Sequence, residues 1–335
     1  MSTLYIFGTP GNVGGAATKI LHLVRLLHRS FEITVVPSHI SFRKDKKIQR
    51  LLAELDVNFR MFNELPTVLN GIALAICELH FFSSGMARRV KERGLKIVWS
   101  NEMMWAFKGE AEAVSAGLID RVLWVSEFQA KAFEEMYAGV SSVCTGNYID
   151  PEDFRWKDRK NPVFTIGRLS RNDKDKYPFN FPAFYEELLP CDTCFRVMAW
   201  GSELAKRYRW HRFDKRWTFY KSDAIPSMEF IQSLDLFVYP LGHRIRESWG
   251  RSVVEAMLTG CVPLVPKGHQ FHKLMRHGES GFICGPFEEW AECARELRFD
   301  YPFRMKIARA SCEFAREELC APDFHRGVWE RALTF

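Results

Sequence analysis

The sequence lacks several features that would assign the protein to a membrane, secreted or repeat class. No apolar run approaches the roughly 20 residues of a transmembrane helix. No repeat of fixed period is present, which excludes solenoids and propellers. Nine cysteines show no disulfide-framework spacing, and the first residues lack the basic segment and apolar core of a signal peptide. We therefore expect reduced thiols and a cytoplasmic protein, peripheral at a membrane at most.

What the sequence does have is apolar material and a mild positive charge. Of 335 residues, 47% are hydrophobic, which is enough to fill a core and excludes disorder as the main state. The length exceeds the roughly 250 to 300 residues at which single cores stop growing, so two domains are expected. The 47 Lys and Arg against 41 Asp and Glu give a net charge of +6. This balance suits a phosphate-bearing ligand or an anionic surface without requiring either.

Short apolar runs alternate with helical patterns, which indicates an α/β fold with parallel sheets. Strands are expected first at residues 4–7, 31–36, 72–77, 96–100 and 121–125. The pattern restarts near residue 161, with strands at 163–166, 195–198, 217–219, 234–239 and 262–265. We expect a boundary near 151–161 and therefore domains at 1–155 and 156–318. The last segment, 319–335, is expected to be a helix that crosses back to the first domain.

The first candidate site is the glycine-rich turn at residues 8–15, between a strand and a helix. Backbone N–H groups at a helix N-terminus favour phosphate. The spacing of Gly8, Gly11 and Gly14 also imitates that of sugar-nucleotide dehydrogenases. However, no acidic residue follows the second strand and the chain has no Tyr-x-x-x-Lys pair. Glycines that merely allow close helix packing are the structural alternative.

The second candidate site is the charged turn at residues 167–176. Arg168 offers a planar fork for paired phosphate oxygens, and the lysines offer compact point charges. Together they could hold a diphosphate. A solvated charged loop is the alternative.

The third candidate site, and the most informative, is the stretch 246–257. Glu247 and Glu255 are eight residues apart, and an apolar helix begins after Gly250. Amides of Ser248, Trp249 and Gly250 would then point at an anion, and Glu255 could accept hydrogen bonds from vicinal hydroxyls such as those of a ribose. The alternative for Glu255 is a buried carboxylate paired with a nearby Lys or Arg.

In this order, the Gly14-Gly15 turn, the Gly167-Arg168 loop and the E-x7-E element resemble a known family. It is the retaining, nucleotide-sugar-dependent glycosyltransferases of the GT-B fold (family 4-like, group 1), and the resemblance covers nearly the whole chain. It implies two Rossmann-like domains whose parallel sheets face each other across a cleft. It also implies transfer of a sugar from a nucleoside diphosphate-sugar to a hydroxyl of a glycan, lipid-linked or small-molecule acceptor, with retention of anomeric configuration.

The resemblance also implies a role for each matching residue. Arg168 and Lys176, or Lys174 in its place, would neutralise the donor diphosphate, so that no metal is expected. Glu255 would bind the ribose, and Glu247 would contact the transferred sugar. The other donor contacts would come from Ser248, Trp249 and Gly250, and from Gly14 and Gly15 of the first domain.

On the acceptor side, the resemblance places His80 near the reacting sugar, although a histidine at a strand end with satisfied hydrogen bonds is as good an interpretation. The segment 100–104 stands where relatives carry a histidine-containing turn, which leaves Glu102 as a candidate.

Two other functions stay open at this point. One is a sugar-nucleotide epimerase or oxidoreductase. The other is a binding module that docks on a membrane or polymer through the basic, amphipathic stretch 42–52. The aromatic residues between 210 and 220 are expected to pack in a core rather than to stack on nucleic acid, and no nucleic-acid partner is expected.

Overall fold

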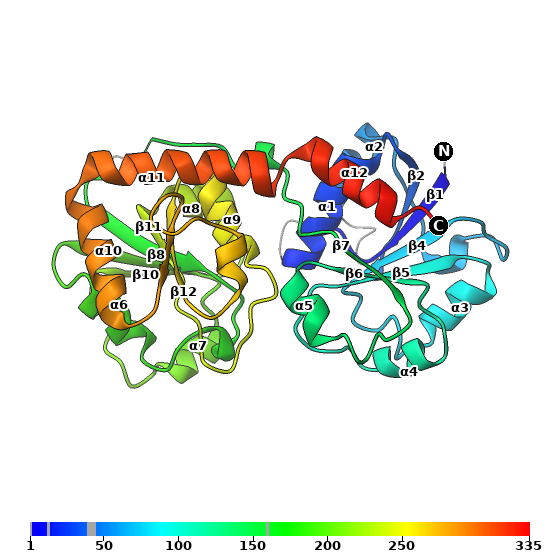
Figure 1. Cartoon of the computed structure of the whole chain (residues 1–335), viewed down its shortest axis with the longest axis horizontal. Coiled ribbons are helices and arrows are strands. Elements are labelled where there is room, and N and C mark those ends of the chain that lie inside the picture. Colours follow the sequence, from blue (N-terminus) through cyan, green and yellow to red (C-terminus); the bar gives the residue numbers. More distant parts are fainter. Residues whose placement is uncertain (1, 12–13, 39–44, 159–160) are drawn as a thin grey trace. The chain divides into compact units, whose positions relative to one another are not determined.

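The computed structural model describes residues 2–11, 14–38, 45–158 and 161–335. These form two compact units: Met1–Ile149 with Pro322–Phe335, and Asp150–Ala321 (Figure 1). The chain therefore divides at 149/150, where the sequence predicted 155/156. The reason lies in Arg316, whose guanidinium donates to the carbonyls of Pro151 and Phe154 and ties this connection to the second unit.

The first unit contains a parallel sheet of seven strands in the order β3-β2-β1-β4-β5-β6-β7. The strands are β1 (Ser2–Phe7), β2 (Phe31–Val36), β3 (Asn58–Phe59), β4 (Ile72–Ile76), β5 (Lys96–Asn101), β6 (Arg121–Trp124) and β7 (Ser141–Cys144). The five central strands were predicted from their apolar runs. The outer strands β3 and β7 were not, because β3 has only two residues and β7 is largely exposed.

Helices cover both faces of this sheet, as a parallel sheet requires. They are α1 (Gly15–Leu27), α2 (Lys46–Glu54), α3 (Met86–Glu92), α4 (Glu110–Ser115), α5 (Glu127–Ala132) and α12 (Pro322–Ala332). The C-terminal helix α12 belongs to this unit: it packs beside α1 (Figure 1), and Trp329 and Leu333 are buried in the same core as Leu23. Ile48 and Leu52 of α2 are also buried in that core.

The second unit contains a parallel sheet of six strands in the order β10-β9-β8-β11-β12-β13. Its strands are β8 (Phe164–Leu169), β9 (Thr193–Met198), β10 (Trp217–Tyr220), β11 (Leu236–Val238), β12 (Val262–Pro266) and β13 (Phe282–Cys284). Its helices are α6 (Phe181–Leu188), α7 (Ser202–Arg207), α8 (Ser227–Gln232), α9 (Arg251–Leu258), α10 (Phe287–Phe299) and α11 (Tyr301–Phe314). Much of its core is aromatic, and Trp217 packs there with Phe181, Tyr185 and Phe195.

The strand order reverses once in each sheet, between β1 and β4 and between β8 and β11. Loops that leave neighbouring strands at such a point run to opposite faces, and ligands bind in the crevice that opens at the carboxyl ends of the strands. The two parallel α/β sheets confirm the expected fold class. Within the described ranges, every helix is too short or too polar to cross a membrane.

Candidate functional site

A buried ion pair lies at the reversal point of the second sheet. Lys176, at the end of the short helix η4 (Lys174–Lys176) after β8, places Nζ 2.5 Å from Oε2 of Glu247, in the loop after β11. The hydroxyl of Tyr239 donates to the same carboxylate oxygen over 3.0 Å. Both charged side chains are about 10% exposed. The loops that carry them follow neighbouring strands, which is why residues 71 positions apart meet here.

The surroundings keep both partners of this pair charged. Burial disfavours the ammonium of Lys176, but Tyr239 and the Glu247 carboxylate outweigh it and raise the pKa of Lys176. Burial likewise opposes ionisation of Glu247, yet Lys176 and the Tyr239 hydroxyl hold the pKa of Glu247 below its usual range. The Lys176 ammonium therefore stays protonated at neutral pH, paired with the ionised Glu247 carboxylate at the carboxyl edge of this sheet.

Helix α9 begins beside this pair, on the loop that carries Glu247. Its N-cap Gly250 has a φ of 102°, and an added Cβ would lie 2.8 Å from Cε1 of Phe271, so that only glycine fits. Two hydrogen bonds hold this loop. The Glu247 N–H donates to Nδ1 of His269 over 3.4 Å, and the Gln270 side chain donates to the Ser248 carbonyl. The N-terminus of α9 is thus set rigidly beside the buried lysine.

Glu255 lies in the second turn of α9 and pairs with Arg251. Arg251 Nε lies 3.0 Å from Glu255 Oε1, and the two side chains are 11% and 10% exposed. Burial raises the pKa of Glu255, and Arg251 offsets this only in part. The paired carboxylate that the sequence left as an alternative is therefore present, and contact with a ribose stays a prediction.

Arg168 is fully buried rather than open to a ligand. Its Nη1 donates to the Pro240 carbonyl over 2.6 Å and its Nη2 to the Lys176 carbonyl over 3.2 Å. The guanidinium carbon lies 3.9 Å from the Tyr177 ring centroid and 4.4 Å from that of Tyr239. In this arrangement Arg168 holds the backbone of Lys176 in place, and its direct contact with a diphosphate stays a prediction.

The structure separates the two lysines between which the sequence did not decide. Lys174 is exposed, whereas Lys176 is in the buried pair. The expectation of no metal assumed that the chain has no Asp-x-Asp triplet, a pattern associated with metal sites; this was wrong, because Asp173-Lys174-Asp175 is such a triplet. Here the Asp173 carboxylate accepts from the Asp175 N–H over 3.0 Å and lies 3.7 Å from Nη2 of Arg171, so it caps the turn.

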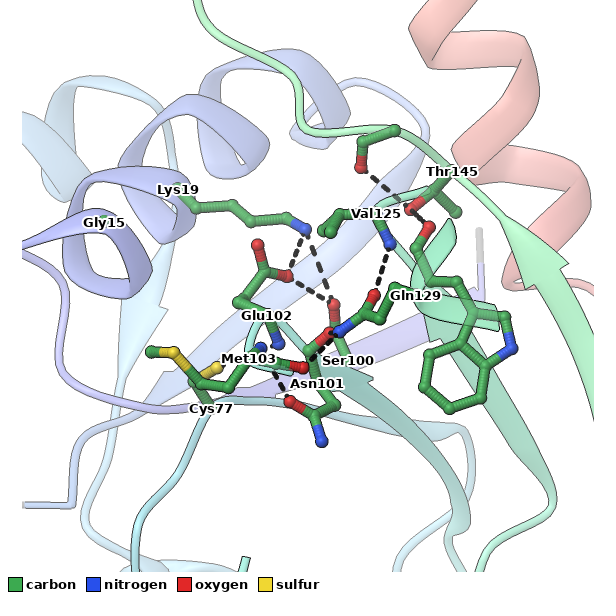
Figure 2. Close-up of polar contacts among 12 residues, drawn as sticks. Gly15, Lys19, Cys77, Ser100, Asn101, Glu102, Met103, Val125, Gln129 and Thr145 are labelled. Atoms are coloured by element: carbon green, nitrogen blue, oxygen red, sulfur yellow. Dashed lines mark hydrogen bonds and ion pairs between the residues drawn. The ribbon is translucent and has the colours of Figure 1, made fainter. Parts of the chain in front are cut away.

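The first unit has a polar cluster at the carboxyl edge of its own sheet (Figure 2). Lys19, on α1, is fully buried, and its Nζ lies 2.5 Å from Oε1 of Glu102, which follows β5. The same oxygen accepts from Ser100 Oγ over 2.8 Å, and the Glu102 N–H donates to Cys77 Sγ over 3.1 Å. The cluster therefore brings together α1 and the ends of β4 and β5.

Gln129 of α5 fixes the loop that carries Glu102. Its Nε2 donates to the carbonyls of Asn101 and Met103 over 2.6 and 2.8 Å, and its Oε1 accepts from the Val125 N–H over 2.9 Å (Figure 2). Sequence reasoning named Glu102 but missed Lys19 and Gln129. The signal for Lys19 was available: it is a lone cation four residues before Leu23 on the apolar face of its helix.

Gly14, Gly15 and His80 lie on loops around the reversal point of the first sheet. Gly14 is the N-cap of α1 with a φ of 90° and has no atom within 4 Å of an added Cβ, and Gly15 is exposed. His80 is exposed in the turn after β4. Residues 12 and 13 of the glycine turn lie outside the described part of the chain. The roles expected for these three residues stay predictions.

Comparison with known proteins gives a family match within the second unit and a shared fold for the whole chain. Residues 215–311, which include Glu247 and all of α9, match the family model described as glycosyl transferases group 1. No curated protein matches the sequence.

Solved structures of several glycosyltransferases share the fold at low sequence identity. The HepE protein of Anabaena, solved with UDP and glucose, aligns with a TM-score of 0.76 at 15% identity over 100% of both chains. A glycosyltransferase from Rickettsia africae aligns with a TM-score of 0.75 at 12% identity over 99% of this chain and 98% of its own. Sucrose-phosphate synthase from Thermosynechococcus elongatus gives 0.72 at 10% identity over 99% of each. Residues 215–311 are thus similar to the group 1 glycosyl transferases, and the whole chain shares the fold of these solved structures.

Proposed function

We propose that this protein transfers a sugar from a nucleoside diphosphate-sugar to a hydroxyl acceptor, with retention of anomeric configuration. The observation that carries the proposal is the buried Lys176–Glu247 pair beside the N-terminus of α9. A cation and a helix N-terminus at this edge of a parallel sheet suit a diphosphate, and a carboxylate suits the hydroxyls of a sugar. HepE of Anabaena was solved with UDP-glucose, which makes this the first donor to test.

Lys176 would act mainly on the leaving group. Negative charge grows on the diphosphate as the bond to the sugar breaks, so a fixed ammonium stabilises the transition state more than the ground state. Glu247 keeps that ammonium charged and in place, and Arg168 anchors the backbone from which it projects. We propose that these groups suffice without a metal. The Asp173-x-Asp175 triplet could instead hold a metal ion. A chelator distinguishes metal-dependent transfer from metal-independent transfer.

The acceptor would bind at the carboxyl edge of the first sheet. Glu102 is held there by Lys19 and Ser100, and His80 is exposed on the turn after the neighbouring strand β4. A carboxylate fixed in this way can accept a hydrogen bond from a hydroxyl group of the acceptor. The reacting group of the acceptor would be a hydroxyl of a glycan, a lipid-linked sugar or a small molecule.

A panel of nucleoside diphosphate-sugars, assayed for slow hydrolysis with and without EDTA, tests the proposal. We expect at least one donor to release its nucleotide at a rate that EDTA leaves unchanged. Lys176→Gln should slow the release about 100-fold or more, whereas Lys174→Gln on the same loop should not. Failure of every donor, or reduction of added NAD+ to NADH by the sugar nucleotide in place of nucleotide release, would reject glycosyl transfer. Loss of the activity in EDTA would reject only its metal independence.

A further inference from the structure

The second unit carries a concentration of positive charge that the proposed chemistry does not use. Between residues 202 and 216, which span α7 and the turn after it, six Lys and Arg stand against two Asp and Glu. This short segment has a net charge of +4, whereas the whole chain has +6. Arg216 is engaged with Asp214 over 2.8 Å. Lys206, Arg209, Arg212 and Lys215 are exposed, and none of the four makes an ion pair with a described residue.

Two large apolar rings lie on the surface within this charge. Phe179 is 65% exposed and Trp210 is 50% exposed, and their rings stack with centroids 5.7 Å apart and an interplanar angle of 21°. The neighbouring Trp217 is buried in the core, as the sequence predicted. Trp210 departs from that expectation, because its ring is left in water beside a second exposed ring.

The ring pair is held in place by the fold. The hydroxyl of Tyr208 donates to the Pro178 carbonyl over 2.5 Å, and Nη2 of Arg207 donates to the Tyr177 carbonyl over 3.3 Å. These bonds fasten the turn that carries Phe179 to the end of α7, which carries Trp210. The two rings and the four cations thus form one built surface, which we call the aromatic–basic patch (Phe179, Lys206, Arg209, Trp210, Arg212, Lys215).

We propose that the aromatic–basic patch docks the second unit on a membrane surface rich in anionic phospholipid. Cations attract such a surface, and Trp and Phe rings gain by moving from water to the headgroup level. A soluble polyanion that offers only charged groups would use the cations but would leave the two exposed rings in water. The combination therefore favours a lipid surface over a charged polymer.

The stretch 42–52 fits this role less well, although the sequence suggested it. Residues 42–44 lie outside the described part of the chain. In α2, Ile48 and Leu52 are 2% and 0% exposed, so the apolar side of this helix is used by the core and no large apolar side chain of α2 is exposed. The exposed Lys46, Lys47 and Arg50 thus offer a matched control: three cations without apolar rings.

Co-sedimentation of the full chain with two kinds of vesicle tests the proposal. One kind is phosphatidylcholine alone, and the other also contains about 30% phosphatidylserine. We expect binding only to the anionic vesicles. Reversal of the three patch cations by Lys206→Glu, Arg209→Glu and Arg212→Glu should weaken binding about 100-fold or more. Reversal of Lys46, Lys47 and Arg50 should change it much less. The double variant Phe179→Ser, Trp210→Ser, with its charge intact, should still lose about tenfold or more.

Three results would overturn the proposal. One is a wild-type chain that stays in the supernatant with both kinds of vesicle. Another is an equal loss of binding for the two triple reversals, which would show a response to net charge alone. The third is binding to heparin but not to vesicles, which would assign the patch to a soluble polyanion. Thermal unfolding of each variant shows whether it is folded, and donor hydrolysis gives a second check, because these residues lie outside the proposed donor contacts.

Discussion

Tyr239 and Lys176 share one oxygen of the Glu247 carboxylate, with Tyr239 Oη 3.0 Å and Lys176 Nζ 2.5 Å from Oε2. Tyr239 follows β11 directly, and Lys176 comes from the loop after β8. The Tyr239 hydroxyl therefore fixes Glu247 from the β11 side of the reversal point, and the Lys176 ammonium approaches it from the β8 side. Both contacts lower the pKa of Glu247, so its negative charge depends on both neighbours.

Removing the Tyr239 hydroxyl should move the acid limb of the pH–rate profile. Since the pKa of Glu247 is held low, the carboxylate stays charged well into acid; without one of its donors it takes a proton at a higher pH. A hydrogen bond to a charged group contributes about 1.5–3 kcal/mol, so Tyr239→Phe should shift the limb upward by roughly one to two pH units. Tyr177→Phe is the control, because that buried hydroxyl has no hydrogen-bond partner among the described residues. An acid limb that stays in place in Tyr239→Phe would contradict this account.

Arg168 should contribute to stability as well as to any catalysis. Replacement by Met leaves the Pro240 and Lys176 carbonyls without their buried donor, which should lower the free energy of unfolding by about 3 kcal/mol or more. Urea denaturation measures this loss. Arg171→Gln, a change at a largely exposed arginine of the same loop, should lower it by less than about 0.5 kcal/mol. If Arg168 served only to bind phosphate, its replacement would leave unfolding unchanged.

The Lys19–Glu102 pair should be strongly coupled in the first unit. Lys19→Met or Glu102→Gln alone leaves a buried charge without its partner and should cost about 3–5 kcal/mol of unfolding free energy. The double variant should cost at least about 1 kcal/mol less than the sum of the two single changes. Denaturant titrations of the four proteins complete the cycle. Additive losses would mean that the two side chains act independently.

Gly250 should tolerate no side chain, for two separate reasons. Gly250→Ala combines left-handed backbone strain with a contact of 2.8 Å to Phe271. Gly268→Ala has a similar φ of 93° but meets nothing within 4 Å, so it isolates the strain, which is worth roughly 1–2 kcal/mol. We expect Gly250→Ala to lower the melting temperature further than Gly268→Ala and to weaken donor binding as well. Equal effects of the two changes would show that the contact with Phe271 is easily relieved.

The central strands of both sheets could be predicted because a parallel strand buried on both faces is a continuous apolar run, as at Ile72–Ile76. β3 and β7 gave no such signal, since an edge strand needs little apolar surface. The E-x7-E stretch predicted Glu247 on a loop and a helix that begins near Gly250. The structure confirms both, because Gly250 is the N-cap of α9. The same stretch showed that Glu255 needs a partner, and Arg251 is one turn away.

Contacts between distant segments could not be derived from one sequence. Lys19 and Glu102 are 83 residues apart, and nothing in the local pattern of α1 points to the loop after β5. Arg168 illustrates the same difficulty in another form. An arginine after a strand and glycine suggests an open phosphate ligand, but whether its guanidinium reaches outward depends on Tyr177, Pro240 and Tyr239, which close around it.

The affinities of UDP and UDP-glucose for the wild type, Lys176→Gln and Glu247→Gln, measured by calorimetry, test the central claim most directly. If Lys176 holds the diphosphate and Glu247 the sugar, Lys176→Gln weakens both ligands about tenfold or more, and Glu247→Gln weakens UDP-glucose more than UDP. Wild-type affinity for UDP in Lys176→Gln would contradict the claim.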